Sequence, residues 1–295
     1  TMKLARCCKL LKVLCFPPCC PRNIIEHATF QPPPPSYSVQ YNPQSGDYVV
    51  IIDRFQESNF LKRHSISITD IEFTYVSTKS GTKIACMYYA VKPAKRSTIL
   101  YSHGNASDLG SVIGLAICLA KTVHCNILVY DYSGYGQSSG KPSEKQIYID
   151  IEAAFNLLLT KYNCRPEDVI LFGQSLGSAP TIDLASRVAV QAVVIQSGFA
   201  SALNVAFPRE DKQPMCCDIF ENINKVSRVT SPTLVIHGTR DDVIDLSHGA
   251  AIYEQCPGTQ TVEPLWVVGG GHNDLELYTQ FTHRLRKFFK EELPH

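Results

Sequence analysis

Six short runs of apolar residues are the feature of this sequence that most limits how the chain folds. They lie at residues 97–102, 125–131, 168–173, 191–197, 232–238 and 264–270. Each is a continuous, mostly aliphatic and β-branched stretch, which is typical of strands buried on both faces of a parallel sheet. The intervals between the runs are long enough for the crossover connections that parallel strands require.

Helical patterns occupy these intervals, at residues 109–122, 144–162, 176–187, 247–255 and 273–292. Two further strand-like stretches, residues 65–76 and 82–91, precede the runs and are separated by a Lys-Ser-Gly turn. They predict an antiparallel hairpin at the start of the sheet. The expected fold class is therefore α/β, with a doubly wound, mostly parallel sheet of about eight strands.

Composition and charge exclude some classes of protein. The formal net charge of the 295 residues is +1, without the basic excess of a nucleic-acid-binding protein, so we expect no nucleic-acid partner. No apolar run reaches the eighteen or so residues of a membrane-spanning helix. The cysteines after residue 20 lack metal-like CxxC spacing and are typical of reduced, cytosol-facing thiols. They are Cys86, Cys118, Cys125, Cys164, Cys216, Cys217 and Cys256. We expect neither a metal nor a cofactor.

The first twenty residues hold the other five cysteines, which are Cys7, Cys8, Cys15, Cys19 and Cys20. A secretory signal peptide would need an unbroken apolar region, but lysines and prolines interrupt this one. A zinc site is disfavoured because adjacent cysteine pairs are awkward for tetrahedral ligation. S-acylation explains the thiols, their apolar neighbours and the nearby basic side chains together. We therefore predict residues 1–22 as a lipid anchor that holds the protein at the cytosolic face of a membrane.

A proline-rich stretch follows the cysteines. Residues 30–43, FQPPPPSYSVQYNP, favour extended polyproline II, which is not expected to join a sheet. The pattern predicts a linker over residues 23–64, acting as a tether between the anchor and a catalytic domain at residues 65–295.

The clearest chemical motif is GQSLG at residues 173–177. It directly follows the apolar run VILF and precedes a helical pattern, which is the context of a nucleophile elbow. Such a strained strand-to-helix turn exposes a serine Oγ. We predict that Ser175 is a nucleophile, in preference to a serine that only caps a helix.

A serine nucleophile needs a base, and the chain has nine histidines. His103 and His237 stand at strand ends, but His272 follows the last strand on a glycine-rich loop from which its imidazole can reach the carboxyl edge of the sheet. The chain order of serine, acid and histidine is also the order of this fold. His272 is the predicted base.

The acid is expected between Ser175 and His272, in the segment VIHGTRDDVID. Asp241 follows the strand by a short turn, where a carboxylate can fix the tautomer of the histidine. The alternatives are Asp242, which also fits an exposed loop charge, and Asp245, which also fits a helix N-cap. We favour Asp241.

Acyl transfer also requires backbone N–H groups that bind the developing oxyanion. One is expected from Leu176, the residue after the nucleophile. The other is expected from the loop HGNASD, where Gly104 and Asn105 are the candidates and the N–H of Asn105 is preferred.

Several segments together resemble one known family. YSHGNASDLG, YDYSGYGQSSGKPSE, GQSLG, HGTRDDVIDLSHG and GGGHNDLELY, with the cysteine-rich start, are similar to the alpha/beta-hydrolase domain-containing protein 17 family. The resemblance runs over nearly the whole chain and implies an alpha/beta-hydrolase fold. It also implies a membrane-associated, N-terminally palmitoylated serine hydrolase that removes palmitate from cysteines of proteins such as Ras and postsynaptic scaffolds. By position, the family's triad falls on Ser175, Asp241 and His272.

The resulting hypothesis is a palmitoyl-protein thioesterase whose partners are S-palmitoylated membrane proteins. The interval between residues 197 and 232 is too short for the large helical lid of many lipases, so an open site is expected. The alternatives are a lipid or small-ester hydrolase at the cytosolic membrane face and a catalytically inactive adaptor that binds lipidated partners.

Overall fold

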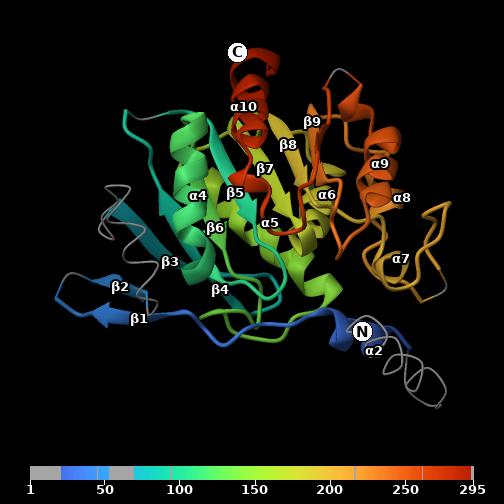
Figure 1. Cartoon of the computed structure of the whole chain (residues 1–295). Coiled ribbons are helices and arrows are strands. Elements are labelled where there is room, and N and C mark those ends of the chain that lie inside the picture. Colours follow the sequence, from blue (N-terminus) through green and yellow to red (C-terminus); the bar gives the residue numbers. More distant parts are fainter. Residues whose placement is uncertain are drawn as a thin grey trace.

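The computed structural model describes residues 21–44, 46–52, 70–93, 95–215, 217–260 and 262–293. Its centre is an eight-stranded sheet in the order β10-β9-β8-β7-β5-β6-β4-β3, covered by helices on both faces (Figure 1). The strands are β3 (Ile71–Ser77), β4 (Lys83–Tyr89), β5 (Thr98–Ser102), β6 (Asn126–Tyr130), β7 (Val169–Gln174), β8 (Ala192–Gln196), β9 (Thr233–Gly238) and β10 (Leu265–Val267). All six apolar runs thus form strands, and the predicted fold class is confirmed.

The directions of the strands also agree with the prediction. The strands from β5 to β10 run parallel to one another, whereas β3 and β4 pair as an antiparallel hairpin and β4 joins β6 antiparallel. Every residue of β5, β6, β8 and β9 is buried, as expected for strands that are covered on both faces. The part of the predicted hairpin before residue 70 lies outside the described residues.

Five helices of the described residues fall in the intervals where they were expected, and two short ones, α7 and α8, lie between β8 and β9, where none was predicted. In chain order these helices are α4 (Leu109–Val123), α5 (Glu144–Thr160), α6 (Ser178–Ala185), α7 (Ala202–Ala206), α8 (Asn222–Val226), α9 (Leu246–Gln255) and α10 (Thr279–Lys287). The helix predicted from residue 273 begins later, because residues 275–277 form a separate 3₁₀ turn after the glycine-rich loop. Likewise, a 3₁₀ turn at Ser175–Gly177 precedes α6.

Two hydrophobic cores lie on opposite faces of the sheet. Helices α4 and α10 pack together on one face, and α5, α6 and α8 pack on the other (Figure 1). Capping residues define where the helices of both faces begin. Asp108 accepts the N–H of Ser111 at the start of α4, and Ser143 accepts the N–H of Gln146 at the start of α5.

The segment predicted as a linker packs against the fold over its described part. It contains α2 (Pro21–Thr29) and a hairpin of β1 (Tyr37–Asn42) and β2 (Asp47–Ile52). Ile25 and Phe30 are buried in the core on the α5 face, whereas Tyr37 and Val50 are buried in the core on the α4 face. Its aromatic and aliphatic side chains therefore hold it on the body, although prolines 32–35 themselves have no regular structure.

Over its described residues, 197–215 and 217–232, the connection between β8 and β9 holds only the short helices α7 and α8. Among the described residues, no helix has the length and apolar character needed to cross a membrane. The candidate acylation sites Cys7, Cys8, Cys15, Cys19 and Cys20 lie outside the described residues.

Candidate active site

Ser175 stands on a strained turn between β7 and α6. Its φ of 52° lies in the left-handed region, which residues with a side chain rarely adopt. The glycines on either side make this turn possible. A Cβ on Gly173 would lie 2.5 Å from the carbonyl oxygen of Gly177, and a Cβ on Gly177 would overlap the backbone of Ser102. The GQSLG segment therefore folds as the predicted elbow, with Ser175 at its apex.

His272 reaches Ser175 from the loop after β10. Its Nε2 is 2.9 Å from Ser175 Oγ, and its Nδ1 is 2.7 Å from Asp241 Oδ2. Because an ionised carboxylate only accepts hydrogen bonds, Nδ1 carries the proton and donates it to Asp241. Nε2 is then left to accept the hydroxyl proton of Ser175, which is the orientation that a general base requires.

Backbone hydrogen bonds hold the His272 loop in place. The N–H of Arg240 donates to the carbonyl of Gly270 at 2.8 Å, and the N–H of Gly271 donates to the carboxylate of Asp274 at 2.7 Å. The Tyr278 hydroxyl donates to the carbonyl of Gly269 at 3.0 Å. The segments after β9 and β10 thus support each other and place the histidine.

Of the three candidate acids, Asp241 is the one that hydrogen-bonds to His272 within the described residues. Its side chain is fully buried, and it accepts the N–H groups of Val243 and Ile244 at 2.9 and 2.8 Å. Asp242 is exposed, and Asp245 caps α9 by accepting the N–H of Ser247. These last two positions match the alternative interpretations of the sequence.

The pKa of Asp241 is well below its ordinary value. Burial acts to raise it, but hydrogen bonds from His237 and His272, the charge of His272 and the N–H of Ile244 together outweigh the burial. The carboxylate is therefore ionised at neutral pH and is suited to stabilise an imidazolium on His272.

His237, which was a candidate base by its position in the sequence, lies instead beside Asp241. Its Nε2–H donates to the carbonyl of Ile244 at 2.9 Å and lies 3.4 Å from Asp241 Oδ2. The ring is fully buried. Its place at the end of β9, four residues before Asp241, is the sequence signal that points to this supporting role.

The loop after β5 lies against the elbow, as the oxyanion prediction requires. A Cβ on Gly104 would lie 3.7 Å from the Cβ of Ser175, and the backbone of His103 packs against Gly177. Asn105 follows directly and is half-buried, while Leu176 is buried beside Ser175. The two predicted N–H donors therefore belong to the two segments that meet at the nucleophile.

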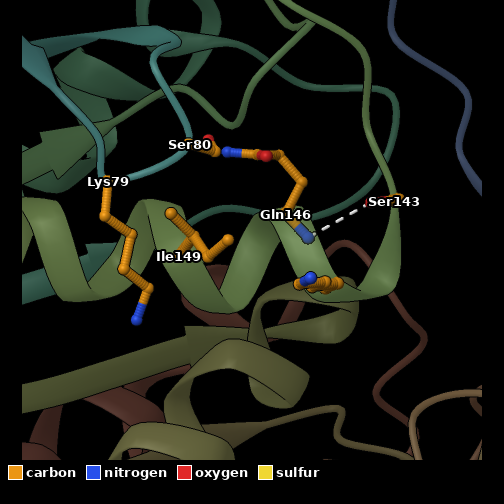
Figure 2. A pocket seen from close by; sticks show the side chains of 6 residues that line it. Lys79, Ser80, Ser143, Gln146 and Ile149 are labelled. Carbon is orange, nitrogen blue, oxygen red and sulfur yellow. Dashed lines mark hydrogen bonds between the residues drawn. The ribbon is translucent and has the colours of Figure 1, made fainter.

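One pocket lies outside the predicted active site. A pocket of about 370 Å³ is lined by Lys79, Ser80, Ser143, Lys145, Gln146 and Ile149, at the β3–β4 turn and the start of α5 (Figure 2). It contains none of the predicted site residues. In the described ranges, no group of three or more His, Cys, Asp and Glu side chains is arranged to hold a metal ion.

The described cysteines after residue 20 are free thiols, and Cys216 lies outside the described residues. Cys86, Cys125 and Cys256 are buried. Burial raises the pKa of the Cys125 thiol to about 12, against a lesser lowering by Lys95. A buried thiol of this kind is protonated at neutral pH and is a poor nucleophile.

The sheet, the elbow and the Ser175–His272–Asp241 hydrogen-bonded chain define the protein as an α/β hydrolase. Residues 97–215 match the family model described as alpha/beta hydrolase fold. The chain is 46% identical to alpha/beta hydrolase domain-containing protein 17C of Xenopus laevis, over 97% of this chain and 95% of the relative. It is 45% identical to protein 17B of Homo sapiens, over 97% and 96%. The chain belongs to the alpha/beta hydrolase domain-containing protein 17 family.

Solved structures of lower identity share the fold. The esterase Pf2001 of Pyrococcus furiosus superposes with a TM-score of 0.63 at 18% identity, covering 78% of this chain and 94% of the esterase. Est1E of Butyrivibrio proteoclasticus, solved with ferulic acid bound, gives a TM-score of 0.60 at 16% identity, covering 74% and 98%.

Proposed function

We propose that this hydrolase is a palmitoyl-protein thioesterase that uses Ser175, His272 and Asp241 as its catalytic triad. The observation that carries the proposal is the hydrogen-bonded chain from Ser175 Oγ to His272 Nε2, at 2.9 Å, and from His272 Nδ1 to Asp241, at 2.7 Å. The substrates are S-palmitoylated cysteines of membrane-associated proteins, an assignment that rests on membership of the protein 17 family and the features that the sequence shares with it.

Acylation of the enzyme is the first half of the reaction. Ser175 Oγ attacks the thioester carbonyl carbon while its proton passes to His272 Nε2. The carbonyl oxygen becomes an oxyanion, which accepts hydrogen bonds from the N–H groups of Leu176 and Asn105. Collapse of this intermediate breaks the carbon–sulfur bond. The cysteine sulfur leaves as the thiol with the proton held by His272, or as the thiolate while His272 gives that proton to solvent, and either route returns His272 to its neutral form.

Deacylation repeats the same proton transfers with water. His272 accepts a proton from water as the water oxygen attacks the acyl-serine carbonyl, and the second oxyanion occupies the same site. The carbon–oxygen bond to Ser175 then breaks, Ser175 recovers its proton from His272, and the fatty acid leaves. Asp241 stays ionised throughout and stabilises the imidazolium form of His272.

Two features support a thioester carried by a protein. A cysteine thiol has a pKa of about 8.5, so it leaves with little help from a general acid. In addition, the described residues between β8 and β9 form only the short helices α7 and α8, which leaves this side open to the approach of a macromolecular substrate.

The proposal includes a membrane location. S-acylation of Cys7, Cys8, Cys15, Cys19 and Cys20 would hold the enzyme at the cytosolic face of the plasma membrane or endosomes. This part rests on the sequence of the first twenty residues and on the family resemblance.

The test is a panel of acyl substrates with the purified full-length protein. We expect labelling by a fluorophosphonate probe and hydrolysis of long-chain acyl thioesters in preference to matched oxygen esters. Turnover of oxygen esters alone would instead favour the lipid or small-ester hydrolase. An absence of both labelling and turnover would favour the inactive adaptor.

A further inference from the structure

The N-terminal strap, which we define as residues 29–37, crosses the edge of the sheet where the candidate active site lies. It leaves α2 on the α5 face and enters β1 on the α4 face, and Figure 1 shows it running along this edge of the molecule. On its way it bonds to two residues of the loop that follows β5, Asn105 and Asp108. This loop supplies one of the proposed oxyanion donors.

The first attachment is made by the side chain of Asn105. Its Nδ2 donates to the carbonyl of Thr29 at 2.6 Å, and its Oδ1 accepts the N–H of Gln31 at 3.0 Å. The hydroxyl of Tyr135 donates to the same Oδ1 at 2.7 Å. Both ends of the Asn105 amide are therefore bonded, and two of its three partners belong to the strap.

Buried aromatic residues of the body support this attachment. Tyr135 is fully buried and packs edge-to-face against Tyr132, with 5.4 Å between the ring centroids. The hydroxyl of Tyr132 in turn donates to the carbonyl of His103 at 2.6 Å. The partner of Asn105 on the body is thus itself fixed in a packed cluster.

The second attachment lies three residues further along the loop, at Asp108. The N–H of Ser36 donates to Asp108 Oδ2 at 2.6 Å, and the Ser36 hydroxyl bonds to Oδ1 of the same carboxylate. Asp108 also caps α4. The loop is therefore held by the strap on one side and by the Ser175 elbow on the other.

We infer that the strap positions the oxyanion donor through the side chain of Asn105, a role that rests on the proposed function. An oxyanion donor contributes to catalysis only when it is already oriented before the charge develops. The backbone here is strained, because Ala106 has a φ of 47°. The three hydrogen bonds of the Asn105 side chain oppose relaxation of that backbone and hold its N–H toward the oxyanion. Asn105 is thus a positioning residue through its side chain, and the strap contributes to this role through Thr29 and Gln31.

The experiment compares three full-length variants on a soluble acyl thioester. Asn105→Ala removes all three side-chain bonds but keeps the backbone N–H. Tyr135→Phe removes one of those bonds and keeps the ring. Gln137→Ala is the matched control. Gln137 Nε2 donates to the carbonyl of Tyr37 at 3.0 Å, so it contacts the end of the strap that is remote from Asn105. Active sites are counted by complete labelling with a fluorophosphonate, and kcat is expressed per labelled site.

Asn105→Ala should lower kcat per site by at least about tenfold and leave KM within about twofold, because a misplaced donor weakens only the transition-state interaction. Tyr135→Phe should lower kcat by a smaller factor in the same pattern, and Gln137→Ala should match the wild type. A merely structural role would reduce the number of labelled sites or the Tm without changing kcat per site.

An unchanged kcat per site in a folded Asn105→Ala variant would overturn the inference. If that variant does not fold, a wild-type kcat per site in Tyr135→Phe would overturn it equally. A wild-type protein that hydrolyses no acyl ester would instead refute the proposed function, so the two failures are distinguishable.

Discussion

The two sides of the candidate active site are held in different ways. The base side, with Asp241 and His272, is supported by residues near it in the sequence, such as Val243, Ile244 and Asp274. The oxyanion side, with Asn105, is held by the N-terminal strap, whose contact residues lie 74 and 76 positions earlier in the chain. Hydrogen bonds within each loop therefore help to hold Asp241 and His272, whereas contacts from a distant part of the chain hold the loop that is proposed to bind the oxyanion.

Removing the nucleophile or the base should have the largest effect. Ser175→Ala and His272→Ala should each lower kcat by a factor of about 10⁴ to 10⁶, because the triad acts as a unit. Ser175→Ala should also abolish fluorophosphonate labelling while the Tm stays close to that of the wild type. Near-normal turnover by Ser175→Ala would refute the assignment of the nucleophile.

Asp241→Asn tests whether the acid has been correctly chosen. It should lower kcat by about 10⁴, because the asparagine favours the wrong tautomer of His272. Asp242→Asn is the matched control and should change kcat by less than about twofold, since its side chain is exposed. The reverse ranking in steady-state assays would move the acid to position 242.

The strap should also contribute to folding. Phe30 is 7% exposed and packs edge-to-face against Phe220, so Phe30→Ala should lower the free energy of unfolding by about 3–5 kcal/mol. Leu277→Ala, on the base side, should cost little because Leu277 is 84% exposed. Urea unfolding of both variants measures the difference. Equal costs would mean that the strap adds nothing to the stability of the fold.

Acid should remove the contribution that the ionised Asp241 carboxylate makes to the stability of the fold. A carboxyl whose pKa is lowered in the folded state stabilises the fold above its unfolded pKa of about 4, and this contribution is lost as the pH falls through the folded value. The pKa of Asp241 is lowered in this way. The Tm difference between the wild type and Asp241→Asn should therefore shrink as the pH falls below about 4. A difference that stays constant from pH 6 to pH 3 would contradict this account.

The smallest effect on soluble turnover is expected for the five cysteines before α2. Replacing Cys7, Cys8, Cys15, Cys19 and Cys20 by serine should leave kcat on a soluble thioester within about twofold, because the strap contacts at the site begin at Thr29. Fractionation should show movement from membrane to cytosol, since stable anchoring requires two acyl chains or one chain with basic residues. Turnover of membrane-bound substrates should fall, because the enzyme is no longer concentrated on the membrane that carries them.

Unchanged membrane residence of the five-serine variant would rule out cysteine acylation as the main anchor. Loss of soluble activity would instead show that residues before α2 contribute to the catalytic domain.

The sequence by itself determined the strands and the motifs that carry the chemistry. Strand burial produces continuous apolar runs, and the tight elbow demands glycines at positions 173 and 177, so both leave signals in adjacent residues. The same local reading placed Asp241 and His272 after the last two strands of the sheet. Both residues could be assigned to the carboxyl edge of the sheet, because parallel strands all end at that edge.

Only the tertiary structure decided which of these residues touch, and how the first part of the chain is used. His272 meets Ser175 across 97 residues, and His237 adds a second imidazole beside Asp241. Residues 30–43 were not expected to join a sheet, yet Tyr37–Asn42 forms strand β1, and Phe30 and Tyr37 are buried on opposite faces of the fold. Composition shows that prolines avoid regular structure, but not where their neighbours are buried. That location depends on the complementary surfaces and hydrogen-bonding groups of Asn105, Tyr135 and Asp108, which come together only when the chain folds.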